Sequence, residues 1–109
     1  MIIQVNTDMS ISGDKKFESY LNTLIKGELH QFDDQINRIE VHLDEGGSKN
    51  GDNDKRCMLE ARLENSPPVA ATSLGNTVEQ AVSGALDRLK TSIDRKLKKS
   101  NAYTVSLSS

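Results

Sequence analysis

The alternation of apolar and polar residues in "INRIEVHLDE", residues 36–45, constrains the fold of this chain most strongly. Successive side chains of a β-strand point to opposite faces of a sheet, so Ile39, Val41 and Leu43 share one face. The polar and charged residues between them share the other face, which favours contact with water. The pattern therefore predicts a half-buried strand, with one side against a core and one side open.

Three more segments have strand character. Residues 2–7 alternate and are rich in β-forming residues, and "KRCMLEARLE", residues 55–64, repeats the alternation with Cys57 among its inward residues. "VAATSL", residues 69–74, predicts a short strand after a turn that contains two prolines. Residues 46–54 are polar and glycine-rich, and they predict a loop longer than a tight hairpin turn.

Helical spacing of apolar residues predicts two helices. The first lies between residues 14 and 30, where the apolar pattern repeats about every 3.6 residues. Thr77 followed by Gln80 has the form of a capping box, which starts a second helix at Val78. The apolar positions are Phe17, Leu21, Leu24, Ile25 and Leu29 in the first helix, and Val78, Val82, Ala85, Leu86, Leu89, Ile93 and Leu97 in the second.

The resulting element order, β-α-β-β-β-α, predicts an α+β fold. Its sheet has four strands, mainly antiparallel, and both helices pack on the apolar face of that sheet. Residues 1–99 are expected to form a single domain. Residues 100–109 are small and polar without a helical pattern, so we expect a flexible tail there.

The composition indicates the cellular compartment in which the chain acts. It has 109 residues and one cysteine, Cys57, which excludes an internal disulfide and fits a reducing compartment. The inward position of Cys57 predicts a small buried side chain, not a reactive thiol. The chain has no apolar run of about 18 residues to span a membrane, and its N-terminus lacks the features of a secretory signal. We therefore expect a cytoplasmic protein with no membrane partner.

Charge is distributed unevenly along the chain. Residues 87–99 carry six basic and two acidic side chains, whereas residues 1–86 carry eight basic and fourteen acidic ones. At about 100° per residue, Arg88, Arg95 and Lys99 fall on one side of the second helix, away from its apolar stripe. The basic residues therefore form a row on the solvent side of the helix.

The other charged residues of this helix complete the pattern. Lys98 also lies on the solvent side, while Asp87 and Asp94 flank the apolar stripe from the other edge, so we expect the two signs to be segregated. On charge alone, two interpretations stay open. Basic residues near a helix C-terminus complement the helix dipole and keep the surface soluble. A rigid row of cations can also bind successive phosphates of a nucleic acid.

Several segments together resemble the ribosome hibernation-promoting factor family, also called ribosome-associated inhibitors or sigma-54 modulation proteins. These segments are "MIIQVNTD", "FDDQINRIEVHLDEGG", "GDNDKRCMLEARLENSPPVAATS" and "AVSGALDRLKTSIDRKLKK". They cover nearly the whole chain up to about Lys99. The chain is similar to the short form of the family, which lacks an additional C-terminal dimerisation domain.

This resemblance implies a fold similar to double-stranded-RNA-binding domains and a specific partner. Members of the family bind the small ribosomal subunit through 16S rRNA, in the channel that messenger and transfer RNA would occupy, and so inhibit translation. By resemblance, the rRNA-binding residues of this chain are Arg88, Arg95, Lys98 and Lys99 on the second helix and Lys26 on the first.

The chain also departs from the family's pattern. Thr91 stands where the family commonly has another basic residue, and Glu79 stands where a tyrosine is usual. Each lost cation lowers the expected number of phosphate contacts. An alternative is therefore a protein-interaction module that keeps the fold but has lost the ribosome. Such a module could pair through its open sheet face or an edge strand, including weak pairing with itself.

The sequence indicates neither catalysis nor metal binding. His42 has no nucleophile or second acid beside it in the predicted sheet. One cysteine and two separated histidines do not make a zinc site, and residues 44–54 lack the spacing of a calcium-binding loop. We therefore expect a non-enzymatic protein with no cofactor, no metal and no small-molecule substrate.

Overall fold

The computed structural model describes the backbone of residues 1–7, 15–45 and 55–108, and side chains in these ranges up to Lys98. The predicted loop at residues 46–54 lies outside the described residues. The elements are β1 (Ile2–Thr7), α1 (Lys15–Glu28), a short 3-10 helix η1 (His30–Phe32), β2 (Ile36–Glu45), β3 (Lys55–Leu63), β4 (Val69–Gly75) and α2 (Val78–Ser108). This order confirms the predicted β-α-β-β-β-α arrangement and the α+β class.

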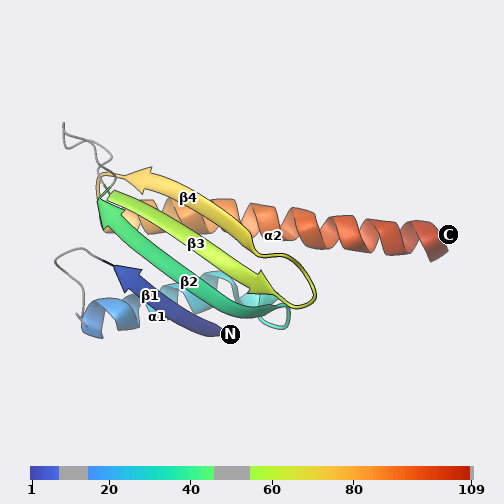
Figure 1. The fold of residues 1–109 in the computed structure, drawn as a ribbon, viewed down its shortest axis with the longest axis horizontal. Helices are drawn as coiled ribbons and strands as arrows, with labels where there is room; N and C mark the ends of the chain where they lie inside the picture. The colour runs from blue at the N-terminus through green and yellow to red at the C-terminus, as the bar shows by residue number, and fades with distance from the viewer. Residues whose placement is uncertain (8–14, 46–54, 109) are drawn as a thin grey trace.

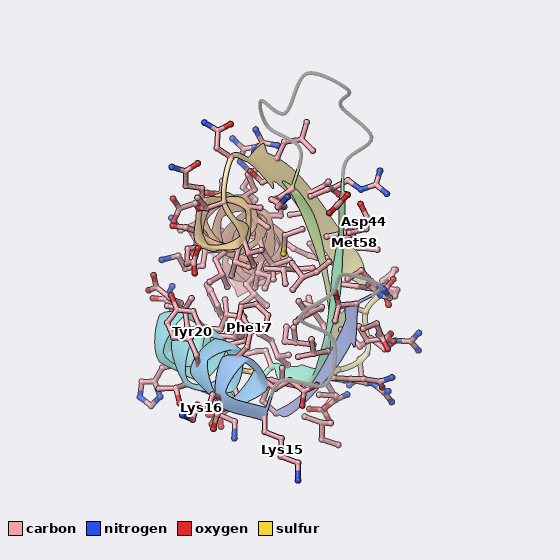
Figure 2. All side chains as sticks on the ribbon, turned by 90° about the vertical axis from the view of Figure 1, so that its left-hand side faces the viewer. Lys15, Lys16, Phe17, Tyr20, Asp44 and Met58 are labelled. Carbon is pink, nitrogen blue, oxygen red and sulfur yellow. The ribbon has the colours of Figure 1, made fainter. Side chains whose placement is uncertain are left out.

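The four strands form one sheet in the order β1-β2-β3-β4. β1 is parallel to β2, because α1 carries the chain back between them, whereas the β2–β3 and β3–β4 pairs are antiparallel. β1 and β4 are therefore the two edges of the sheet. Both helices lie on the same side of it, as Figure 1 and Figure 2 show.

The core fills the layer between the sheet and the helices. The alternation predicted for β2 and β3 is confirmed, since Ile39, Val41, Cys57 and Leu59 are fully buried. From the helices and from Leu29, which follows α1, the core receives Leu21, Ile25, Leu29, Ala81, Val82, Ala85, Leu86, Leu89 and Ile93. Burial of these side chains supplies the main free energy that holds the helices on the sheet.

The opposite face of the sheet is open and carries charged side chains. The register between β2 and β3 sets Glu40 opposite Glu60 and Arg38 opposite Arg62, which by itself is unfavourable. Arg62 offsets this repulsion, because its guanidinium lies 3.5 Å from a carboxylate oxygen of Glu40 and 3.4 Å from one of Glu60. At one end of the face, Arg56 forms a hydrogen-bonded ion pair of 2.7 Å with Asp44.

A capping box has two hydrogen bonds, and the structure confirms one of the two for the capping box predicted at the start of α2. The Gln80 N–H donates to Thr77 Oγ1 at 3.1 Å. The Gln80 side chain accepts from the N–H of Asn76 at 3.0 Å, not from that of Thr77 as in a standard capping box. The first contact satisfies an N–H group that the first helical turn leaves without a partner, and the second ties the residue before the cap to the helix.

The end of α2 differs from the sequence expectation. The apolar pattern stops at Leu97, but the helical backbone continues to Ser108. No glycine or proline follows Gly84 in the sequence, so nothing local terminates the helix. α2 is about 46 Å long at 1.5 Å per residue, and Figure 1 shows it extending beyond the sheet. Whether residues 100–109 behave as a separate tail stays a prediction.

In the described part of the chain, neither helix combines the length and the apolar character of a membrane span.

α2 lies close to β4 because two glycines leave room for the approach. A Cβ on Gly84 would lie 3.0 Å from Ser73 Cβ and still closer to Ser73 Oγ. A Cβ on Gly75 would lie 2.7 Å from the backbone nitrogen of Ala81 and 2.8 Å from Gln80 Cβ. Ser73 itself is buried under the helix. Small residues on both elements therefore set the distance between α2 and the edge strand.

We expect Gly84→Ala to lower the free energy of unfolding by about 1–2 kcal/mol. Overpacking against Ser73 costs about 1–3 kcal/mol, whereas the higher helix propensity of alanine returns at most about 1 kcal/mol. Urea denaturation followed by circular dichroism measures the difference. The double variant Gly84→Ala with Ser73→Ala should recover part of the loss, because it removes the hydroxyl nearest the added methyl group. A stabilised Gly84→Ala single variant would contradict the close packing.

The buried position of Cys57 predicts an unreactive thiol. Burial raises the pKa of the Cys57 thiol from 9.0 to about 12, so at pH 8 its thiolate is about a thousandfold rarer than that of a free thiol with the unshifted value. Modification by Ellman's reagent should therefore be slow in the folded protein and should accelerate with urea in step with unfolding. Because the folded-state pKa is raised, stability should fall as the pH rises above 9.0. Rapid modification of the folded protein at pH 8 would contradict the burial of Cys57.

Candidate nucleic-acid interface

The exposed side of α2 carries Arg88 and Arg95, two helical turns apart. Both side chains are exposed. Arg88 Nη1 donates a 2.6 Å hydrogen bond to the carbonyl oxygen of Thr72 on β4, which holds one side of the guanidinium against the edge of the sheet. Among the residues that the structure describes, neither arginine forms an ion pair with a carboxylate. Both positive charges are therefore available to an external anion.

Arg88 and Arg95 line the same hollow, of about 500 Å³, between α2 and β4. The rest of its lining consists mainly of small side chains, which leaves the guanidinium groups accessible. These residues are Ala70, Ala71 and Thr72 from β4 and Asp87, Thr91 and Ser92 from α2. The structure therefore brings together two of the five residues that the resemblance assigns to RNA binding.

Lys98 differs from the two arginines because its charge is already paired. Its ammonium lies 3.0 Å from a carboxylate oxygen of Asp94, one helical turn earlier. Asp87 lines the same hollow as Arg88 and Arg95. The expectation that acidic and basic residues of α2 are segregated is therefore wrong. A lysine side chain is long enough to reach a carboxylate four residues away, and a helical wheel does not account for that reach.

The remaining two predicted residues are not part of this hollow. The side chain of Lys99 lies outside the described residues. Lys26 lies on α1 and lines a separate hollow of about 420 Å³ that also includes Lys15 and Glu18. Figure 2 shows Lys15 extending away from the sheet. The described residues therefore present two separate groups of cations, one on each helix.

Two further lysines of α2 have structural contacts that our sequence analysis did not predict. Lys96 Nζ donates a 2.7 Å hydrogen bond to the carbonyl oxygen of Pro67, in the turn before β4. Lys90 Nζ lies 3.5 Å from Glu28 Oε2 and so links the two helices. Lys90 adjoins the apolar stripe on a helical wheel, which is a signal for contact with a neighbouring element. For Lys96 the partner is a main-chain carbonyl, which sequence spacing cannot identify.

Thr91 takes part in the helix and does not replace the cation that the family commonly has there. Its hydroxyl donates a 3.1 Å hydrogen bond to the carbonyl oxygen of Asp87. Between the two arginines, the wall of the hollow is therefore polar and uncharged.

Two solved structures share this fold. The N-terminal domain of Protein Y from Thermus thermophilus superposes with a TM-score of 0.68 at 19% identity, covering 87% of this chain and 98% of that domain. A ribosomal subunit interface protein from Coxiella burnetii superposes with a TM-score of 0.61 at 16% identity, covering 90% of this chain and 99% of that one. At such low identity, the two comparisons establish the fold.

Sequence comparison identifies the family to which the chain belongs. No curated protein matches the chain significantly by sequence. The sequence profile described as "Sigma 54 modulation protein / S30EA ribosomal protein" matches residues 3–101, which include all but the first residue of β1, the other described strands and all of α1. The match covers most of the chain, and the fold agrees with it. The chain therefore belongs to the sigma 54 modulation protein and S30EA ribosomal protein family.

Proposed function

We propose that this protein is a ribosome-associated translation inhibitor, or hibernation factor, of the cytoplasm. It binds 16S rRNA in the decoding channel of the small ribosomal subunit and blocks the sites of messenger and transfer RNA by occupying them. Membership of a family that is named for a ribosomal protein supports this proposal. A structural neighbour described as a ribosomal subunit interface protein supports it further.

The exposed pair Arg88 and Arg95 is the observation that carries the proposal. The two residues lie about 10 Å apart along the helix axis at 1.5 Å per residue, a separation at which one RNA strand can contact both. Each guanidinium can donate two parallel hydrogen bonds to a phosphate. Because Arg88 is already held by Thr72 O at 2.6 Å, less side-chain entropy is lost when it binds a phosphate.

The charges around this pair favour selective binding over general adhesion to RNA. The chain has a formal net charge of −2, so most of its surface repels a polyanion. Asp94 neutralises Lys98 at 3.0 Å, and Lys26 sits on the other helix. Binding therefore depends on a few well-placed cations and on the shape of the site. In this proposal Lys98, once released from Asp94, and Lys99 add phosphate contacts further along α2, and Lys26 adds a separate contact on α1.

We expect the double variant Arg88→Glu with Arg95→Glu to bind small ribosomal subunits at least about a hundredfold more weakly. Each substitution removes a charge-assisted contact of about 1.5–3 kcal/mol and adds repulsion from phosphate. Fluorescence anisotropy of the labelled protein, titrated with purified subunits, measures the affinity. Circular dichroism should show an intact fold, since both side chains lie outside the core.

The control for this variant is Lys15→Glu with Lys16→Glu, which changes the net charge by the same amount on α1. It should weaken binding much less if the arginine pair contacts the RNA. Equal losses in the two variants would mean that only net charge matters. An undiminished affinity of the Arg88 and Arg95 variant would exclude this pair as the binding site.

A protein-interaction module with the same fold is the second candidate. The observation that favours it is the position of the hollow at a free edge of the sheet, beside β4.

A further inference from the structure

Within the described residues, the outer edge of β4 has main-chain groups without a neighbouring strand. β4 pairs with β3 on one side and ends the sheet on the other. The carbonyl of Thr72 points to the free side, because Arg88 reaches it from α2. In an antiparallel strand the N–H and C=O of one residue point to the same side, and this direction repeats every second residue. Ala70, Thr72 and Leu74 therefore direct their main-chain groups to the free edge.

α2 runs beside this edge and forms the second wall of the hollow. The helix and β4 run in opposite directions, as Figure 1 shows, so Lys96 contacts Pro67 before the strand and Arg88 contacts Thr72 further along it. Between these two contacts the hollow of about 500 Å³ opens over small side chains. An edge strand next to a helix with a hollow between them is the geometry that binds an extended peptide as an added strand.

We propose that this hollow binds an extended acidic polypeptide segment of a partner protein, which pairs with β4 as a fifth strand. The main chain of the segment bonds to Ala70, Thr72 and Leu74, and its carboxylates pair with Arg88 and Arg95. This site goes beyond the RNA-binding proposal, because its ligand is a protein. It uses the same two arginines, so RNA and peptide exclude each other.

The edge of β4 suits a peptide better than a nucleic acid. Its carbonyl oxygens need hydrogen-bond donors, which the N–H groups of a peptide supply at every second residue. The backbone of RNA offers a 2′-hydroxyl donor on each sugar, but its spacing does not match a β-strand, and the phosphate oxygens cannot donate to these carbonyls. Asp87 also lines the hollow and repels phosphate at that end. A peptide can place an uncharged residue beside Asp87.

The two sides of the added strand require different residues. Side chains that point toward α2 meet Arg88 and Arg95, which favours glutamate or aspartate there. Side chains that point the other way lie beside Leu74, which is 52% exposed on the open face of the sheet. Apolar residues on that side would cover it. The preferred segment therefore alternates between acidic and apolar residues.

Charge disfavours a second copy of this chain as the occupant. Two β4 edges paired about a two-fold axis near Thr72 would bring the Arg88 side chains of both copies together. Each would then compete with the partner strand for the same carbonyl. Without a ligand, Arg88 covers the edge and protects it from uncontrolled strand pairing. An acidic side chain provides an alternative partner for Arg88 and so allows the strand to enter.

The direct test is a titration of isotope-labelled protein with a synthetic octapeptide of alternating glutamate and valine. Nuclear magnetic resonance should show the largest amide shifts at Ala70, Thr72 and Leu74, and slower amide exchange there. The same peptide with lysine in place of glutamate is the matched control and should cause no shift. Absence of shifts at these amides with the glutamate peptide would overturn the proposal, as would equal shifts with both peptides.

Two variants separate main-chain pairing from charge attraction. Thr72→Pro removes the N–H at the free edge, a substitution that edge strands tolerate, and Thr72→Val retains it. The proline variant should lose at least about tenfold in peptide affinity relative to the valine variant. Arg95→Gln leaves the strand unchanged and should also lower the peptide affinity about tenfold. If Thr72→Pro does not fold, the peptide affinity of Arg95→Gln and the amide shifts of the unchanged protein still test the proposal.

The peptide experiment is independent of the ribosome. A separate titration with an oligouridylate of similar length shows whether RNA competes for the hollow. Displacement of the bound peptide by RNA is expected, because both need Arg88 and Arg95, whereas simultaneous binding of the two would contradict a shared site. Subunit binding with no peptide binding would leave the RNA-binding proposal intact and reject the added strand. Peptide binding with no subunit binding would reject the ribosomal function and support the added strand.

Discussion

The close packing of α2 on β4 determines most of what this molecule presents to a partner. Gly75 and Gly84 remove the side chains that would separate the two elements, and Ser73 is buried where they meet. The helix is therefore close enough to the edge strand for Arg88 to reach the carbonyl of Thr72. With a larger residue at Gly84, the hollow and its two arginines would not have the same geometry.

The five basic side chains of α2 that the structure describes between positions 87 and 98 differ in their availability. Lys90 and Lys96 hold the helix to its neighbours, and Lys98 is paired with Asp94. Arg88 and Arg95 keep donors free at the hollow. A count of charges therefore overstates the strength of an RNA-binding surface, since charges in structural contacts contribute less to a phosphate site. This division explains how a chain with a net charge of −2 can still present a local anion site.

The fold could be predicted from the sequence because periodicity is a direct consequence of burial. The alternation in β2 and β3 and the apolar stripe of α2 each specify one buried face, and the structure buries those residues. The end of α2 could not be predicted in this way. An apolar pattern marks the part of a helix that packs, whereas a strong helix breaker such as glycine or proline marks where the helical backbone stops. Neither residue occurs between Leu97 and Ser108.

The candidate site was predictable only in part, for a similar reason. Spacing placed Arg88 and Arg95 on one face of α2, but it could not show the hydrogen bond from Arg88 to a main-chain carbonyl on another element. It also missed the ion pair between Lys98 and Asp94, which depends on side-chain conformation. Spacing identifies which residues share a face of one element. Contacts between elements and main-chain partners require coordinates.

Whether α2 binds ribosomal RNA can be tested by cosedimentation of the purified protein with ribosomes. We would use both small subunits and whole ribosomes, at 50 mM and at 200 mM salt. With three or four phosphate contacts, the affinity should fall by about 20- to 150-fold over this range, because each contact releases counterions. We expect comigration at the lower salt concentration and loss of most of it at the higher one. Absence of comigration at both concentrations, or binding that does not depend on salt, would contradict a ribosomal RNA site on α2.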